Sequence, residues 1–94
     1  MKDQLRLLRE CLRNEIPAIV FQGDDSCAVE VLEAAVDIYK KHGATKEFLY
    51  DFKLLIDDFK LYQKENPFNV TLADLSADET ELVREDMQKK GLSL

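Results

Sequence analysis

One long helical pattern limits what this chain can fold into. Residues 45–66, TKEFLYDFKLLIDDFKLYQKEN, hold the longest uninterrupted helical periodicity in the sequence. At 1.5 Å per residue, such a helix is roughly 30 Å long. Its core-facing side is predicted by apolar residues at i, i+3, i+4 and i+7 spacing, namely Phe48, Phe52, Leu55, Ile56, Phe59 and Tyr62. We expect this helix to be central and to end at Asn66, before Pro67.

A second apolar set on the same helix needs a separate explanation. Tyr50, Leu54 and Leu61 lie nearly opposite the main stripe, and Lys53 and Asp57 interrupt them. One interpretation is ordinary exposed apolar residues, since much of any protein surface is apolar. The other is a subunit contact, and the pattern alone leaves both open.

Residues 27–42 form the clearest of the other helical patterns. Gly43 suits a left-handed position just after this helix, and Thr45 suits the N-cap of the next one. The short loop between them predicts an antiparallel helical hairpin. The position of His42, the single histidine, favours a role in complementing the helix dipole over a role as a general base. The predicted apolar stripe of this helix is Ala28, Val31, Leu32, Ala35, Ile38 and Tyr39, widened by Val29 and Val36.

The two ends of the chain each predict a further helix. The first covers residues 2–14 and has apolar residues at helical spacing. The last begins at Ser76, where Ser76 and Glu79 have the spacing of a capping box, and it ends at Gly91. Its apolar side is narrow, so we expect it to be the least stable element.

Two short runs suggest extended structure. Residues 18–21 are apolar and rich in β-branched side chains, and residues 68–72 alternate apolar with polar. The two runs could pair with each other as a two-stranded ribbon. Otherwise the first run could pair with its own copy in a second subunit, or lie extended across the helices. After the first run, Gly23 suits a positive φ, and Asp24 or Asp25 suits the cap of the following helix. The whole chain is therefore expected to be mainly α, a single four-helix domain over residues 1–94 with a central antiparallel hairpin and one or two short extended segments.

Net charge and cysteine content argue against several kinds of partner and site. The net charge is −6, which argues against binding to nucleic-acid phosphates and to anionic membrane surfaces. The first residues show neither a signal peptide nor a membrane span. Cys11 and Cys27 are too few for a disulfide framework or a zinc site. We therefore expect a cytoplasmic protein.

No stretch carries a chemical motif. Adjacent aspartates in QGDDS lack the alternating ligand spacing of a calcium loop, and the sequence has no glycine-rich phosphate loop or paired CxxC motif. We expect no catalytic residue, cofactor or metal, and hence no enzyme, although a deep polar cleft lined by His42 would favour one.

Part of the chain resembles a known group of proteins. The resemblance rests on the run PAIVFQGDD at residues 17–25, on the HGA turn at 42–44 and on YQKENP at 62–67. These features resemble small helical bacterial proteins of Bacteroides-type genomes, prophages and mobile elements. No activity is attached to this group, so the resemblance implies a small accessory protein that acts by binding.

The expected function is that of a non-enzymatic interaction protein that self-associates as a homodimer or binds an unidentified protein. The expected interface residues are Tyr50, Leu54 and Leu61, or Ile19 and Phe21 in the first extended run. An alternative is an acidic inhibitor or nucleic-acid mimic carried by a mobile element. Such a mimic needs a continuous face of carboxylates, and lysines interrupt the polar faces here, among them Lys53 and Lys60.

Overall fold

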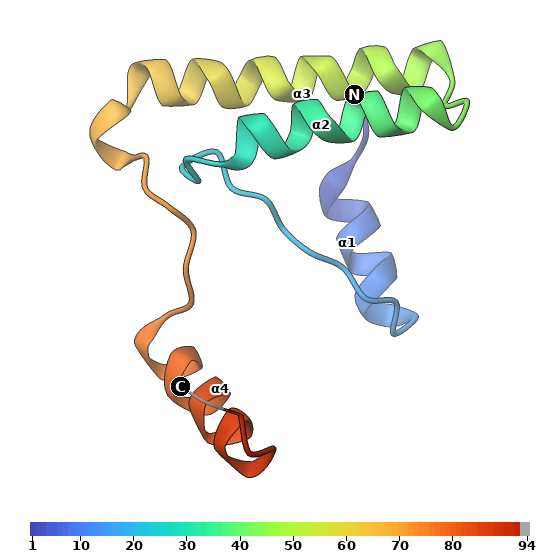
Figure 1. Cartoon of the computed structure of the whole chain (residues 1–94). Coiled ribbons are helices and arrows are strands. Elements are labelled where there is room, and N and C mark those ends of the chain that lie inside the picture. Colours follow the sequence, from blue (N-terminus) through green and yellow to red (C-terminus); the bar gives the residue numbers. More distant parts are fainter. Residues whose placement is uncertain (93–94) are drawn as a thin grey trace.

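A computed structural model describes residues 1–92 and confirms the mainly helical class (Figure 1). These residues hold no β-strand. The single-domain prediction over residues 1–94 extends to two positions outside the described range. The elements in chain order are α1 (Gln4–Arg13), α2 (Ala28–Lys41), α3 (Lys46–Glu65), the 3-10 turn η1 (Pro67–Asn69) and α4 (Ala77–Lys89).

The predicted hairpin is formed by α2 and α3, which run side by side (Figure 1). Gly43 takes φ 86°, as expected for the residue after a helix end. Thr45 then caps α3, because its hydroxyl accepts a hydrogen bond of 3.1 Å from the backbone N–H of Phe48. The turn residues named from the sequence therefore act as predicted.

The hydrophobic core lies between the two hairpin helices. Leu32 and Val36 of α2 and Ile56 of α3 are buried together. The stripe predicted for α2 is partly wrong, since Val31, Ile38 and Tyr39 are exposed. Two adjacent arcs of α2 are apolar, and the single neighbour α3 covers only one of them. Four partly buried residues pack around the core, namely Val29, Leu49, Phe52 and Phe59.

The predicted ribbon between residues 18–21 and 68–72 is wrong. Residues 18–21 have no regular structure and connect the end of α1 with the start of α2 (Figure 1). Pro67 instead begins the 3-10 turn η1. The one isolated bridge in residues 1–92 is parallel and joins Asp25 to Thr71. In it, Ser26 N–H donates to Thr71 O at 2.8 Å and Thr71 N–H donates to Asp24 O at 2.9 Å.

The turn before α2 is held on the end of α3. Gly23 does not take the positive φ expected of it. It lies instead against Tyr62, where an added Cβ would be 3.5 Å from the ring. The side chain of Gln63 donates to two carbonyls of this turn, Gly23 O at 3.1 Å and Asp25 O at 3.0 Å. These contacts connect the chain before α2 to the last turn of α3.

Three helices end in the same way, with a left-handed residue after the C-cap. Gly43 follows α2 and Gly91 follows α4, with φ 86° and 70°. Glu15 occupies this position after α1, with φ 55°. Each end is closed by the long hydrogen bond of a Schellman motif, from Ile16 N to Cys11 O, from Ala44 N to Tyr39 O and from Leu92 N to Met87 O.

The helices α1 and α4 extend away from the hairpin on the same side of it (Figure 1). Neither contains a buried residue. Within residues 1–92, contacts between elements join α2 with α3 and α3 with η1. The radius of gyration is 16.7 Å, against about 12 Å for a compact chain of this length. The fold is therefore an open arrangement with one small core.

Candidate interaction surface

The second apolar set of α3 is at the surface. Tyr50 is 67% exposed, Leu54 37% and Leu61 54%. Tyr50 and Leu54 are one helical turn apart, and Leu61 follows about 10 Å further along the axis. All three side chains are accessible to a partner, but their exposure alone does not distinguish a subunit contact from ordinary surface residues.

The first extended run is also exposed. Ile19 is 79% and Phe21 40% exposed. In the view of Figure 1 the run lies below α2, whereas α3 lies above α2. The five residues predicted as an interface therefore fall into two areas, one on α3 and one on the connection between α1 and α2.

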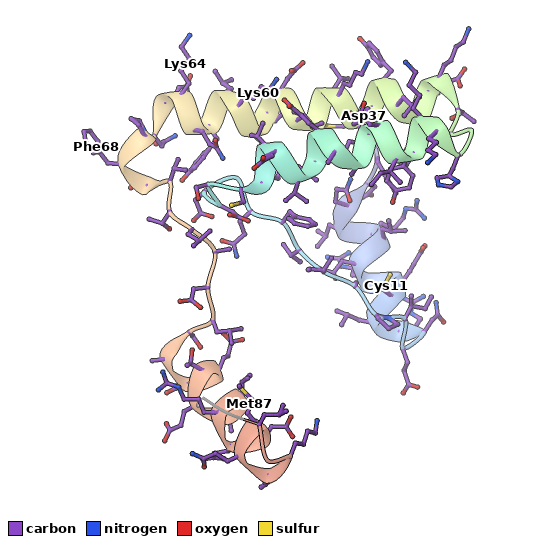
Figure 2. All side chains as sticks on the ribbon, in the orientation of Figure 1. Cys11, Asp37, Lys60, Lys64, Phe68 and Met87 are labelled. Carbon is purple, nitrogen blue, oxygen red and sulfur yellow. The ribbon has the colours of Figure 1, made fainter. Side chains whose placement is uncertain are left out.

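Among residues 1–92, Phe68 is the most exposed large apolar residue, with 98% of its surface accessible. It lies in η1, just beyond the end of α3, and its side chain points away from the ribbon (Figure 2). From the sequence it was expected within an extended run. Phe68 lies in the 3-10 turn η1, which Pro67 begins, and its ring therefore does not lie on one face of a strand. Phe68 is therefore an exposed aromatic residue that the sequence analysis did not single out.

Apolar exposure extends over most elements. Leu5 and Leu12 of α1 are exposed, as are Leu82 and Val83 of α4. In total the chain exposes 8064 Å². A folded monomer of this mass exposes about 5,600 Å². The excess is about 2,500 Å² for each chain.

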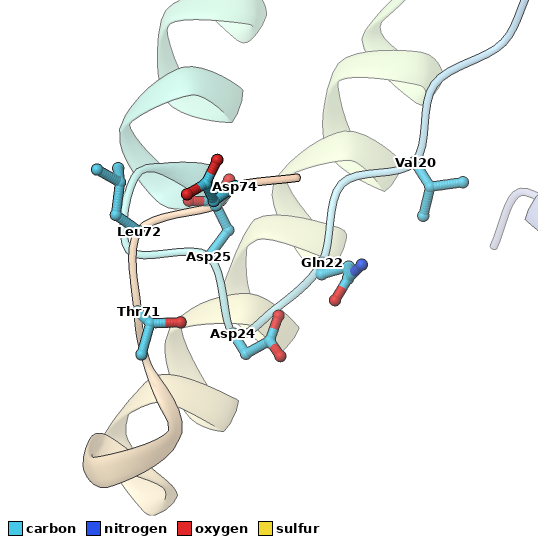
Figure 3. A pocket seen from close by; sticks show the side chains of 8 residues that line it. Val20, Gln22, Asp24, Asp25, Thr71, Leu72 and Asp74 are labelled. Carbon is cyan, nitrogen blue, oxygen red and sulfur yellow. The ribbon is translucent and has the colours of Figure 1, made fainter. Parts of the chain in front are cut away.

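The aspartates of QGDDS line a shallow hollow of about 230 Å³ together with Thr71 and Asp74 (Figure 3). The prediction that Asp24 or Asp25 caps α2 is wrong, because Cys27 is the N-cap and no side chain in residues 1–92 bonds to the first turn. Asp25 Oδ1 instead accepts a hydrogen bond of 2.9 Å from Cys27 N–H and stabilises the turn before the helix. Asp74 Oδ1 accepts a hydrogen bond of 2.7 Å from Leu75 N–H. The geometry of these side chains is that of local turns, and residues 1–92 contain no group of three or more side chains suited to hold a metal ion.

His42 forms the C-cap of α2 and is exposed. Its backbone N–H donates to the carbonyl of Ile38 at 3.2 Å. It lines neither the hollow formed by residues 20–25 and 71–74 nor the groove between α2 and α3. The position at a helix end, beside Lys40 and Lys41, matches the expectation of a residue that complements the dipole.

The outer side of the hairpin carries charges of both signs. Lys60 Nζ lies 2.9 Å from Glu33 Oε1 and connects α3 with α2. The hydrogen bond and the negative charge of Glu33 raise the pKa of Lys60 above 10.5. Both side chains are about half exposed, so this ion pair contributes little to stability. Glu33 and Lys60 line the groove between α2 and α3, and Lys53, Asp37 and Asp57 line it with them. The surface of this groove is therefore mixed in charge.

None of the helices in residues 1–92 combines the length and the apolar character that a membrane crossing requires. No protein-family model, curated protein or solved structure matches the chain.

Proposed function

We propose that the protein is a non-enzymatic interaction protein that self-associates through its exposed apolar surface. The observation that carries this proposal is the accessible surface of 8064 Å², about 2,500 Å² more than a monomer of this mass exposes. Large apolar side chains contribute to this surface, with Phe68 almost fully exposed. Exposed apolar side chains on an extended surface of this size are available for contacts with another copy.

The small core supports the same proposal. Only four apolar side chains in residues 1–92 are buried, namely Ala28, Leu32, Val36 and Ile56. Conformational entropy opposes folding by about 1–2 kcal/mol for each ordered residue. Burial at an interface supplies the stabilisation that so small a core lacks, as in homodimers whose subunits do not fold alone.

The proposal places the action of this protein in the cytoplasm. Cys11 and Cys27 are both unpaired thiols, and free thiols persist in the reducing environment of the cell interior. The alternative of an acidic nucleic-acid mimic has less support, because Lys53 and Lys60 lie between the carboxylates on the outer side of the hairpin. A mimic requires a face of uniform negative charge.

The test is the solution mass, measured by light scattering over a hundredfold range of concentration. The proposal predicts a dimer or a larger assembly, and a mass equal to the monomer throughout would contradict it. A Leu54→Glu/Leu61→Glu variant then tests the α3 surface. It should be a folded monomer if these residues form the subunit contact, whereas an unchanged mass assigns the contact to another surface.

A further inference from the structure

The helices α1 and α4 are the two elements without a packing partner in residues 1–92. Contacts between elements involve only α2, α3 and η1, and neither α1 nor α4 has a buried residue. Both extend from the same side of the hairpin (Figure 1). Each also has exposed apolar side chains, Leu5 and Leu12 on α1 and Leu82 and Val83 on α4. The exposed apolar side chains of both helices are therefore available to a partner.

The two helices have opposite charge. Within its helical bounds α1 has three arginines and one glutamate, for a net charge of +2. Within its bounds α4 has five carboxylates and two basic residues, for a net charge of −3. The residues of α1 are Arg6, Arg9, Arg13 and Glu10, and those of α4 are Asp78, Glu79, Glu81, Glu85 and Asp86 with Arg84 and Lys89.

The spacing of the charges is also matched. The arginines of α1 follow one another at i, i+3 and i+7, and Asp78, Glu81 and Glu85 of α4 repeat at the same interval. Residues at this spacing lie along one face of a helix. Arg6 pairs with Glu10 inside α1 at 2.9 Å. Arg9 and Arg13 form no ion pair within the described part of the chain and are available to an acidic partner.

The surface area indicates what the partner is. Covering the excess of about 2,500 Å² on two copies would bury about 5,000 Å² in total, and obligate homodimers bury about 2,000–5,000 Å² or more. Each copy provides one basic and one acidic helix. A twofold axis brings each of them against its complement in the other copy and makes both contacts equivalent. Pairing α1 with α1, or α4 with α4, would place like charges together.

We propose that two copies of this chain associate reciprocally, the basic helix α1 of each copy packing against the acidic helix α4 of the other. This inference rests on the proposed self-association and specifies its contact. Exposed leucines of α1 and the apolar side of α4 form the buried part of the contact, and the arginine and carboxylate rows flank it. Local complementarity of this kind overcomes the repulsion between two chains that each carry a net charge of −6.

The test uses charge reversal on each helix of the full chain. One variant is Arg6→Glu/Arg9→Glu on α1, and the other is Glu81→Lys/Glu85→Lys on α4. In either variant alone, both reciprocal contacts bring like charges together. We expect the dissociation constant of each to rise by about 100-fold or more. Mixed in equal amounts, the two variants restore opposite charges at both contacts and should form a mixed dimer, identified by its mass in native mass spectrometry.

The control for the α1 variant is Lys46→Glu/Lys64→Glu on α3, which makes the same change in net charge as Arg6→Glu/Arg9→Glu at two exposed positions outside the proposed contact. It should remain a dimer. Circular dichroism verifies that each variant keeps its helices. If a reversal variant loses helical signal, the neutral variants Arg6→Gln/Arg9→Gln and Glu81→Gln/Glu85→Gln replace the pair. Each of these is expected to weaken the dimer and to reduce its sensitivity to salt.

The outcomes separate this inference from the proposed function. If the wild-type chain is a dimer and the reversal variants remain dimers alone, the reciprocal contact is wrong and self-association stands. If both variants are monomers and their mixture stays monomeric, the reciprocal contact is also wrong, because opposite charges between copies do not restore association. A wild-type chain that is a monomer at every concentration overturns both proposals.

Discussion

The side chain of Gln63 donates a hydrogen bond of 3.0 Å to the backbone carbonyl of Asp25, 38 positions earlier in the chain. The same amide group donates to Gly23 O at 3.1 Å. One residue near the end of α3 thus fixes the turn that begins α2. This turn also contains the backbone that pairs with Thr71.

Replacing Gln63 with leucine should destabilise the protein. The substitution removes two hydrogen bonds between uncharged groups, each contributing about 1 kcal/mol, so we expect the free energy of unfolding to fall by about 2 kcal/mol. Urea denaturation followed by circular dichroism measures the change. Lys64→Leu, at the neighbouring exposed position of α3 and outside the proposed contact between copies, is the control and should have little effect. Equal losses from the two variants would show that the Gln63 contacts are not specific.

Replacing Glu15 with glycine should stabilise the protein. Glu15 takes φ 55° at the end of α1, a conformation that costs a residue with a Cβ about 1 kcal/mol or more. Glycine removes this cost and loses part of the gain to its greater freedom in the unfolded chain, for a net gain of up to about 1 kcal/mol. The measurement is the thermal midpoint. Glu15→Gln removes the charge but keeps the Cβ and should give no gain, whereas Gly43→Ala should lower the midpoint.

Acid should weaken the start of α4. Ser76 N–H donates to Glu79 Oε1 at 2.9 Å, and Glu79 N–H donates to the Ser76 hydroxyl at 3.2 Å. These bonds lower the pKa of Glu79 from its ordinary value of 4.5, the backbone bond to Ser76 having the larger effect. A pKa lowered by folding stabilises the folded state above pH 4.5, and this contribution is lost as the pH falls through the lowered value.

The titration is observable by NMR. The amide proton of Ser76 should shift as Glu79 is protonated, at a pH below the midpoint of a freely exposed glutamate. In a Ser76→Ala variant, Glu79 should titrate closer to 4.5, and α4 should lose helical signal while α2 and α3 keep theirs, since α4 has no buried residue. A Glu79 midpoint above 4.5 in the wild-type chain would contradict the capping argument.

The thermal midpoint should depend on protein concentration. An assembly that is stabilised by association shifts towards the folded state as its concentration rises, by mass action. We expect a steady rise of the midpoint over a hundredfold range for the wild-type chain. Differential scanning fluorimetry with an extrinsic dye, or calorimetry, provides the measurement. The Arg6→Glu/Arg9→Glu variant should show a flat dependence, and a flat dependence for the wild type would count against self-association.

Helix positions were predictable because local signals define them. Thr45, Gly43 and the Ser76 capping box mark helix ends through bonds to residues only a few positions away. Glu15 gave no such signal, because its left-handed conformation is imposed on a residue that does not favour it. The Schellman motif that ends α1 is therefore not visible in the sequence.

Tertiary contacts were less predictable. Val31 and Val36 both belong to apolar arcs of α2, and only the position of α3 decides that Val36 is buried. The contacts of Gln63 and Thr71 join segments far apart in sequence and leave no periodic pattern. The predicted interface residues Tyr50, Leu54 and Leu61 are exposed, but their role stays a prediction. Phe68 was missed because the alternation around it indicated a strand.

The parallel bridge between Asp25 and Thr71 has an architectural consequence. It brings the entrance and the exit of the α2–α3 hairpin to one point, so the hairpin forms a closed unit with adjoining ends. Such a unit is suited to insertion into a surface loop of a host protein, because joining it there requires little separation of the host's chain ends. For the same reason, substitutions in α1 and α4 leave the contacts inside the hairpin unchanged, and their effect falls on the proposed contact between copies.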